Sequence, residues 1–310
     1  MILKKAEKFK FYFPEAAFES LLSKYNKTYK DQNERKRRFE IYLRNTEKIE
    51  ENNKLYKNHK ITYLQEANKF SDMTWSEFQN TLGLRIPLDF ANKTKSKRTS
   101  FYSDQLGKVV LAESVNLINN GGVTSVKDQK SNCGSCWAFS VVGAIEGAYF
   151  NHTGNLTELS PSDLIDCSEH TYGCSGGYPG LAFEHVFSEG IAKELDLSYV
   201  PENRICNKTL ERSVKISKII YLNETDYDIM YTLDIKRVPV SALICSPPKM
   251  TAYKEGVFDD ENCMEPCSAG VNHAVLVVGY GTDEVAGHPV DYWLVKNSWG
   301  DDWGEQVGGY

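Results

Sequence analysis

The sequence feature that most constrains the fold is an apolar run from Cys136 to Phe150 that is rich in Ala, Val and Gly. The run is long enough for a buried helix, and residues 151–154 close it. The chain has 310 residues, 41% apolar and 25% charged, which is enough for two domains with ordinary cores. No window approaches the roughly 20 apolar residues that would span a membrane. The run therefore predicts the central helix of a globular domain.

Other stretches divide the chain into a helical first part and a β-rich last part. Apolar residues at helical spacing predict helices from Phe18 to about Tyr56. Residues 85–105 lose this periodicity and gain charged and small polar residues, which indicates a linker and a boundary near residue 105. After about residue 215, short β-branched and aromatic runs predict strands at 238–244, 274–280 and 292–296.

Charge is distributed unevenly between these parts. Residues 1–105 hold 22 Lys and Arg against 14 Asp and Glu, a net of +8, whereas residues 106–310 hold 14 against 28, a net of −14. The basic part lacks an aromatic-basic surface motif, so an intramolecular partner of opposite sign is a simpler explanation than nucleic acid. We therefore expect the two parts to attract each other.

Cysteines and glycosylation sequons indicate an oxidising compartment. The chain has eight cysteines and six Asn-x-Ser/Thr sequons, at Asn26, Asn92, Asn151, Asn155, Asn207 and Asn223. We therefore expect a lysosomal or secreted protein. The first residues lack the apolar run of a secretory signal, so the true N-terminus is expected to lie upstream.

The start of the apolar run carries a candidate nucleophile. Cys136 opens the predicted helix, where the positive end of the helix dipole lowers the pKa of a thiol. Cys133 and Cys136 could instead be a metal or redox pair, but a zinc site needs a second ligand pair and none is clear. We therefore expect no metal and no cofactor. A structural role is expected for most of the histidines, namely His59, His152, His170, His185 and His288.

Residues 129–140, Gln-Lys-Ser-Asn-Cys-Gly-Ser-Cys-Trp-Ala-Phe-Ser, resemble the active-site segment of papain-like cysteine peptidases, and of the cathepsin L-like subfamily in particular. Three further blocks follow the family's order, at 166–179, 271–281 and 296–305. The resemblance implies an α+β fold with a helical lobe and a β-barrel-like lobe, preceded by a small helical inhibitory prodomain. The implied domains are residues 17–75 (prodomain), 76–105 (extended propeptide or linker) and 106–310 (peptidase, truncated at its C-terminus).

The resemblance also implies catalytic roles. Cys136 is the expected nucleophile, His273 its base and Asn297 the residue that orients the histidine, while Trp299 would shield the His–Asn bond from water. Pairing with the imidazolium implies that Cys136 rests as a thiolate. The Gln129 side chain and the Cys136 backbone N–H would bind the oxyanion. Three residues separate Gln129 from Cys133, one more than is usual in the family, so we expect this loop to bulge while Gln129 keeps its place.

Further residues are assigned to substrate binding by the resemblance, namely Gly176, Gly177, Tyr178, Pro179, Asn272 and Trp299. The two glycines are expected to bind the substrate backbone, and Tyr178 and Pro179 to wall the main specificity pocket. The segment faintly resembles a phosphate-binding loop, but no Lys-Ser/Thr follows its glycines.

Polar residues in the predicted first helices match a prodomain motif. The motif positions are Glu34, Arg38, Ile41, Tyr42, Asn45, Ile49 and Asn53, with Tyr42 where Phe is usual. A second motif keeps Asn68, Phe70 and Asp72, but Glu66 stands where the family has Gly, and its side chain is expected to disturb a tight backbone position. A generic amphipathic helix would explain the periodicity but not the fixed polar residues. By resemblance, the prodomain runs through the cleft in the unproductive direction, leaves at acidic pH and is cleaved near residues 100–112.

The cysteine pattern and both ends of the peptidase domain depart from the family. The family pairs Cys133 with Cys174 and Cys167 with Cys206; Cys245 would then pair with Cys263 or Cys267 and leave one free. This odd count and the family comparison indicate a missing C-terminal tail, with exposed apolar surface and no base for the specificity pocket. Ala112 and residues 116–118 also replace a Pro and an Asp-Trp-Arg string typical of relatives.

The sequence therefore predicts the precursor of a cysteine endopeptidase that hydrolyses peptide bonds through a thioester acyl-enzyme. Its expected partners are protein or peptide substrates and its own prodomain, with no nucleic acid and no membrane, and the chain is expected to be a monomer. The alternative is a catalytically inactive homologue that binds and inhibits other cysteine peptidases. Retention of Cys136, His273, Asn297 and Gln129 favours the enzyme.

Overall fold

The computed structural model describes residues 14–87, 98–100, 109–223, 225–260, 270–285 and 287–305. Asn92, Cys263 and Cys267, as well as most of the predicted cleavage region, lie outside these ranges. Across the residues that the structure describes, no helix has both the length and the apolar character needed to cross a membrane.

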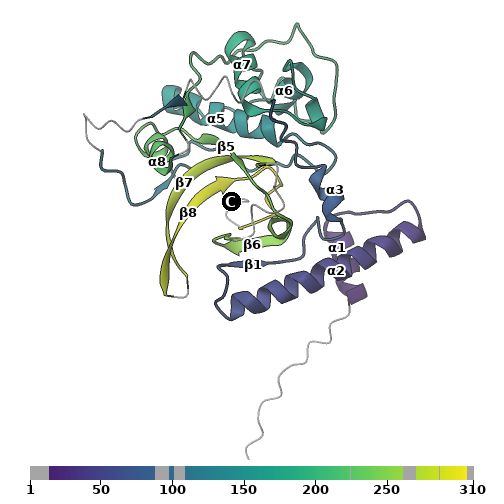
Figure 1. Ribbon diagram of the computed structural model, residues 1–310. Helices are drawn as coiled ribbons and strands as arrows, with labels where there is room; N and C mark the ends of the chain where they lie inside the picture. Colours follow the sequence, from purple (N-terminus) through teal and green to yellow (C-terminus); the bar gives the residue numbers. More distant parts are fainter. Residues whose placement is uncertain are drawn as a thin grey trace, which may run out of the picture.

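A helical lobe surrounds the predicted central helix, α5 (Cys136–Thr153). Helices α6 (Pro161–Cys167) and α7 (Pro179–Glu189) lie beside it (Figure 1). Trp137, Val141, Leu164 and Val186, all fully or almost fully buried, pack together in this core. Since α5 is apolar along most of its length, burial on all sides is its stable environment, and the sequence prediction is confirmed.

An antiparallel sheet covers the opposite side of α5. Its strands lie in the order β3 (Val115–Asn116), β7 (His273–Val285) and β5 (Val240–Ile244), and β8 (His288–Lys296) also pairs with β7. The helix approaches the sheet closely because Gly143 has no side chain; a Cβ there would lie 2.6 Å from Leu276 Cδ2. Helix α8 (Asp226–Asp234) packs on the same sheet. The predicted α+β architecture is confirmed: β5, β7 and β8 overlap the three predicted runs, whereas the short β3 lies outside them.

The N-terminal domain is built on α1 (Pro14–Lys24) and the long α2 (Gln32–Lys57), followed by β1 (Tyr63–Gln65) and α3 (Trp75–Gln79). The predicted domain boundary after residue 75 therefore falls inside α3. Phe18, Leu21 and Tyr42 form its core, so Tyr42 fills the position where Phe is usual. Short strands β2 (Arg98–Thr99) and β4 (Tyr221–Leu222) pair in parallel further along the chain.

The polar motif residues of α2 bind the backbone of the segment that runs from the end of β1 to residue 73. Asn53 Nδ2 donates to Gln65 O at 2.8 Å, and Asn45 Nδ2 donates to Ser71 O and Met73 O, both at 2.9 Å. Asn45 and Asn53 are eight residues apart, which is about two turns of the helix, so both amides face this segment. A generic amphipathic helix needs no such residues, so the contacts account for the fixed polar positions of the predicted motif.

Arg38 makes the most contacts among these motif residues. Its guanidinium donates to Glu77 Oε2 at 2.8 Å, to Asp72 O at 3.1 Å and to Glu34 Oε1 at 3.3 Å. Removing a partly buried charge with three acceptors leaves those acceptors unsatisfied. Replacing Arg38 with methionine should lower the stability of the N-terminal domain by about 2 kcal/mol.

Differential scanning calorimetry of the whole chain measures this loss. Arg44→Met is the matched control, because Arg44 lies on the same helix and is exposed. Equal unfolding temperatures for the two variants would show that the Arg38 contacts contribute nothing.

The N-terminal domain docks on the sheet-containing lobe. β1 pairs antiparallel with β6 (Tyr253–Gly256), and Glu66 N donates to Ala252 O at 2.8 Å. The expectation that Glu66 disturbs a tight backbone was wrong. Glu66 does not have a positive φ, and its exposed carboxylate lies 3.5 Å from Lys254 Nζ.

Disulfides and hydrogen bonds hold the edges of the second domain. The Cys133–Cys174 and Cys167–Cys206 bonds are present as the resemblance implies, and Cys245 is also disulfide-bonded. The altered start is anchored as well: Tyr280 Oη donates to Ala112 O at 2.9 Å, and Ala112 N donates to Asp234 Oδ2 at 2.8 Å. A side chain from α8 and one from β7 thus hold the segment in which Ala112 replaces the Pro typical of relatives.

Candidate active site

Three chain segments far apart in the sequence bring the predicted catalytic residues to the line where the two lobes meet. Cys136 is the first residue of α5, His273 is the first residue of β7, and Asn297 directly follows β8. Cys136 and His273 are completely buried, and the backbone N–H of Ala274 points at the Cys136 sulfur. The helix start and the strand start are therefore in contact at this point.

The His273 ring is held by Asn297 and Trp299. His273 Nε2 lies 2.9 Å from Asn297 Oδ1. Because an amide oxygen can only accept, Nε2 must carry the proton, and Nδ1 of the neutral ring is then an acceptor. Nδ1 is buried and has no hydrogen-bond partner within the described part of the chain. Trp299, the residue predicted to shield the His–Asn bond, stacks on the ring with centroids 4.7 Å apart.

Gln129 keeps a buried position despite the longer loop that follows it. Lys130 has a φ of +64°, a left-handed conformation that turns the chain and takes up the extra residue. Gln129 Oε1 accepts from Ser298 Oγ at 2.6 Å, which orients the amide. Its Nε2 donates to Thr81 O at 2.7 Å and to Cys133 O at 3.0 Å. The expected donor is thus occupied by a backbone carbonyl from the N-terminal part of the chain.

The segment around Gly83 passes directly over the candidate nucleophile. The Gly83 N–H points at the Cys136 sulfur, and a Cβ on Gly83 would lie 1.7 Å from Gly134 O. Gly177 N donates to Gly83 O and Arg85 N donates to Gly177 O, both at 2.8 Å, in a parallel β-bridge centred on Leu84. The chain therefore covers the site so closely that only glycine fits at residue 83.

Of the other predicted substrate-binding residues, Gly176 lies against this segment and Asn272 does not. A Cβ on Gly176 would lie 2.7 Å from Gly83 O, whereas Tyr178 and Pro179 begin α7. Asn272 faces differently: its Oδ1 accepts from Ser246 N at 2.7 Å and its Nδ2 donates to Ser246 O at 3.1 Å. These contacts tie the loop after β5 to the residue before His273, so Asn272 holds the start of β7 in place.

Burial decides the charge of the candidate catalytic pair in this covered state. Burial raises the pKa of Cys136 to about 11, although nearby backbone N–H groups oppose the rise. Burial also lowers the pKa of His273 to about 4, with the Asn297 hydrogen bond opposing the change. Between these values both groups are neutral. The predicted thiolate is therefore wrong for the covered state, because the desolvation cost exceeds the effect of the helix dipole.

The protonation of His273 can be measured directly. In the intact chain at pH 6 to 8 we expect nitrogen NMR of labelled histidine to show a neutral His273 ring with its proton on Nε2. Since its pKa is lowered to about 4, protonation should begin only as the pH falls towards that value. A doubly protonated ring at pH 6 would contradict the burial argument.

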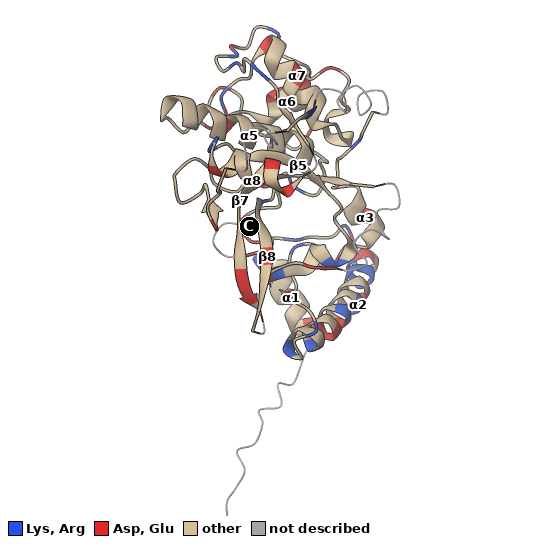
Figure 2. Ribbon diagram, turned by 60° about the vertical axis from the view of Figure 1, so that its left-hand side comes forward, with Lys and Arg blue, Asp and Glu red and all other residues tan. Residues whose placement is uncertain are grey.

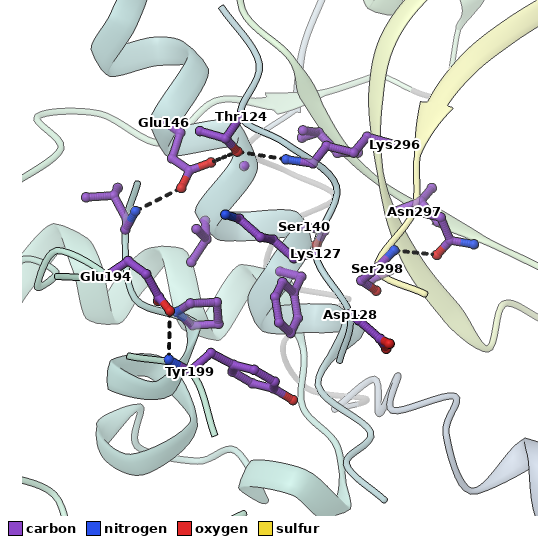
Figure 3. A pocket seen from close by; sticks show the side chains of 18 residues that line it. Thr124, Lys127, Asp128, Ser140, Glu146, Glu194, Tyr199, Lys296, Asn297 and Ser298 are labelled. Atoms are coloured by element: carbon purple, nitrogen blue, oxygen red, sulfur yellow. Dashed lines mark hydrogen bonds between the residues drawn. The ribbon is translucent and has the colours of Figure 1, made fainter. Parts of the chain in front are cut away.

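A cavity of about 120 Å³ is lined by Asn297 and by several residues that the sequence analysis missed (Figure 3). Lys296 Nζ donates to Thr124 Oγ1 at 2.8 Å, which in turn donates to Glu146 Oε2 at 2.6 Å. Burial lowers the pKa of Lys296 to about 8 and raises that of Glu146. This chain connects α5 to the strand that precedes Asn297. The signal was available, since Glu146 is the one charged residue in the apolar run.

Comparisons with known proteins agree with this arrangement. Residues 111–310 match the family described as papain family cysteine protease, and residues 18–78 match the cathepsin propeptide inhibitor domain. Fruit bromelain from Ananas comosus is 34% identical over 297 residues, covering 94% of this chain and 78% of bromelain. Cathepsin L from Sarcophaga peregrina is 36% identical over 289 residues, covering 91% of this chain and 83% of that protein.

Other relatives are longer, and solved precursors have the same fold. The chain spans 59% of the length of falcipain-2a from Plasmodium falciparum, to which it is 36% identical. It superimposes on the digestive procathepsin L2 proteinase from Tenebrio molitor with a TM-score of 0.84 at 32% identity, covering 96% of this chain and 93% of that one. The chain thus belongs to the papain family of cysteine proteases and carries the family's inhibitory propeptide domain at its N-terminal end.

Proposed function

We propose that Cys136, His273 and Asn297 are the catalytic residues of this cysteine protease and that Gln129 stabilises its oxyanion. Nδ1 of His273 takes the proton of the Cys136 thiol, and the sulfur attacks the scissile carbonyl carbon. The C–N bond breaks as His273 gives that proton to the leaving amine, which leaves a thioester. Water then attacks the thioester with His273 as base, releasing the carboxylic acid and restoring the thiol.

One observation carries this proposal most directly. The His273 Nε2 contact with Asn297 fixes the tautomer in which the free Nδ1 can accept a proton, and Trp299 keeps that arrangement dry. A structural histidine has no need of a buried acceptor without a partner. The kept position of Gln129 weakens the case for an inactive binding protein, since the longer loop was a main argument for it.

The direction of the covering segment supports its role as the inhibitor. Thr81 O occupies the Gln129 donor, and Leu84 pairs in parallel with Gly177. We infer that a substrate pairs with Gly177 in the opposite, antiparallel direction, so that the propeptide fills the cleft without offering a productive bond. The expected prodomain, residues 17–75, and extended propeptide, residues 76–105, would then be removed together to leave residues 106–310.

Two carboxylates account for release in acid: Glu77 binds Arg37 and Arg38 inside the N-terminal domain, and Asp128 of the peptidase domain binds Lys69 of the propeptide. For both Glu77 and Asp128, burial opposes ionisation, but hydrogen bonds and nearby cations outweigh it and lower the pKa. Carboxylates with lowered pKa stabilise the closed state above their ordinary pKa, near 4, and lose that effect as the pH falls through the lowered value. When the propeptide leaves, a proton that moves from Cys136 to His273 stays on the protein. The number of bound protons is then the same before and after, so this pair does not make the release depend on pH.

We further propose that the active enzyme is a monomer that acts in a lysosome or outside the cell on protein substrates. Of the predicted glycosylation sites that the structure describes, Asn223 is half-buried and four are exposed on the surface, as a glycan requires, namely Asn26, Asn151, Asn155 and Asn207.

The proposal is tested by lowering the pH of the purified chain in steps from 6 to about 3.5 and following both its size and its cleavage of an internally quenched peptide. Hydrolysis that appears as the N-terminal domain is lost supports the enzyme. A folded, shortened chain that cleaves no peptide would contradict it, and the N-terminal domain should then be assayed against other cysteine proteases.

A further inference from the structure

Lys69 of the propeptide sits between two carboxylates of the peptidase domain. Its Nζ lies 2.9 Å from Asp128 Oδ2 and 2.8 Å from Asp302 Oδ1, and its side chain is 15% exposed. Two carboxylates at these distances compensate the ammonium for its lost hydration. The cations of α2 and of the connection between α1 and α2 that form ion pairs find their partners inside the N-terminal domain; these are Lys27, Lys30, Arg35, Arg37 and Arg38. Figure 2 shows that basic and acidic residues both recur along α2.

A glycine makes the room that this ammonium occupies. Gly300 has a φ of +80°, and a Cβ there would lie 2.7 Å from Lys69 Nζ, 2.9 Å from Asp302 Oδ1 and 3.2 Å from Asp128 Oδ2. Any other residue would place its side chain in the space between the carboxylates. Asp128, Asp302 and Gly300 therefore form a cradle for a cation, which we call the acidic cradle.

The acidic cradle lies on the segments that carry the catalytic residues. Asp128 directly precedes Gln129 and forms a β-bridge with Trp299, and Gly300 N donates to Lys127 O at 3.0 Å. Asp128 is drawn close to Ser298 and Asn297 in Figure 3. A ligand in the cradle thus lies next to the segments that carry Gln129, the proposed oxyanion donor, and Trp299, whose ring stacks on His273.

The propeptide shows on which side of the scissile bond the cradle lies. Gly83 and Arg85 bind Gly177, along which the acyl part of a substrate is proposed to run. Thr81 O marks the oxyanion position on Gln129. The preceding residues continue away from Gly177: the Phe78 and Phe70 rings pack on Trp299 at centroid distances of 5.2 and 5.8 Å, and Lys69 comes next. The cradle therefore lies on the leaving-group side.

We propose that Asp128 and Asp302 form a specificity subsite of the mature protease, which selects lysine or arginine among the first residues after the scissile bond and is filled by Lys69 in the precursor. This inference rests on the proposed peptidase function. Removing the propeptide takes Lys69 away and opens the cradle to solvent. Lys130 Nζ stays 3.0 Å from Asp128 Oδ2 on an exposed side chain, so two carboxylates face one ammonium and the cradle keeps a net negative charge.

The test uses activated enzyme and internally quenched peptides that differ at one position. Lysine is compared with glutamine at the first, second and third residue after a fixed cleavage site, because three extended residues span about 10 Å. At one of these positions we expect kcat/KM for the lysine peptide to exceed that for the glutamine peptide about five-fold at low ionic strength, and less in salt. Asp302→Asn should reduce this ratio towards one, whereas Asp301→Asn, which neutralises the exposed neighbouring residue, should leave it unchanged.

The outcomes separate the claim of a subsite from the claim of a peptidase. Equal rates for the lysine and glutamine peptides at all three positions would overturn the acidic cradle as a subsite, and so would a preference that survives in Asp302→Asn. Either result would leave the proposed peptidase function standing, because the enzyme would still cleave the peptides. Failure to cleave any peptide would instead count against the peptidase function.

Discussion

Replacing Cys136 with alanine should abolish peptide-bond cleavage, with a loss of about 10⁶-fold in kcat, the scale known for removing the nucleophile of another protease. The thiol lies at the first residue of α5, next to the backbone N–H of Ala274. No other cysteine in the described part of the chain is free to replace it. The measurement is hydrolysis of a quenched peptide after acid treatment, with the size of the chain followed in parallel.

A control in the same helix separates lost chemistry from lost structure. Ser140→Ala removes a buried hydroxyl that lies 2.9 Å from Ser241 Oγ, one turn beyond Cys136, and should leave turnover near that of the unmodified enzyme. Cys136→Ala should keep its fold and its propeptide, since little volume is lost. Peptide cleavage that persists in Cys136→Ala would show that another residue is the nucleophile.

Replacing Gln129 with alanine should lower kcat about 10²- to 10³-fold while KM changes little, because an oxyanion donor acts chiefly in the transition state. The amide is already aimed at a carbonyl: its Nε2 lies 2.7 Å from Thr81 O, and Ser298 holds its other end. The same change should weaken binding of the propeptide, since Thr81 O loses its donor. Steady-state kinetics on activated enzyme give both constants.

The neighbouring residue provides the matched control for Gln129. Lys130 has a φ of +64°, so Lys130→Gly fits the same backbone without strain and should keep kcat. If Gln129→Ala retained full kcat while Cys136→Ala was inactive, the oxyanion role would have to be reassigned to other donors.

Local patterns in the sequence predicted the parts of the fold and of the site that depend on one segment at a time. The apolar run from Cys136 predicted the buried helix, and short β-branched and aromatic runs predicted β5, β7 and β8. The motif positions of α2 were recognised, but their partners, carbonyl groups of β1 and of the segment after it, became visible only in the structure.

Features that depend on several distant segments could not be predicted. The charge imbalance between the two parts predicted attraction, but not that Lys69 would meet Asp128 and Asp302 beside Gly300. The helix dipole suggested a thiolate at Cys136, whereas the pKa depends on how deeply Gly83 and its neighbours bury the thiol. Thr124 was likewise invisible as the link between Glu146 and Lys296, because these residues come from three separate segments.

The central claim is that the chain is a protease precursor whose Cys136 is covered by its own propeptide. Titration with a peptidyl epoxide that alkylates active-site thiols tests it most directly, on the purified chain at pH 7 and again after incubation near pH 3.5, with the labelled residue mapped by mass spectrometry. The account predicts little labelling at pH 7 and one equivalent at Cys136 once the propeptide has left. A folded, shortened chain that remains unlabelled, or an intact chain that is fully labelled at pH 7, would contradict it.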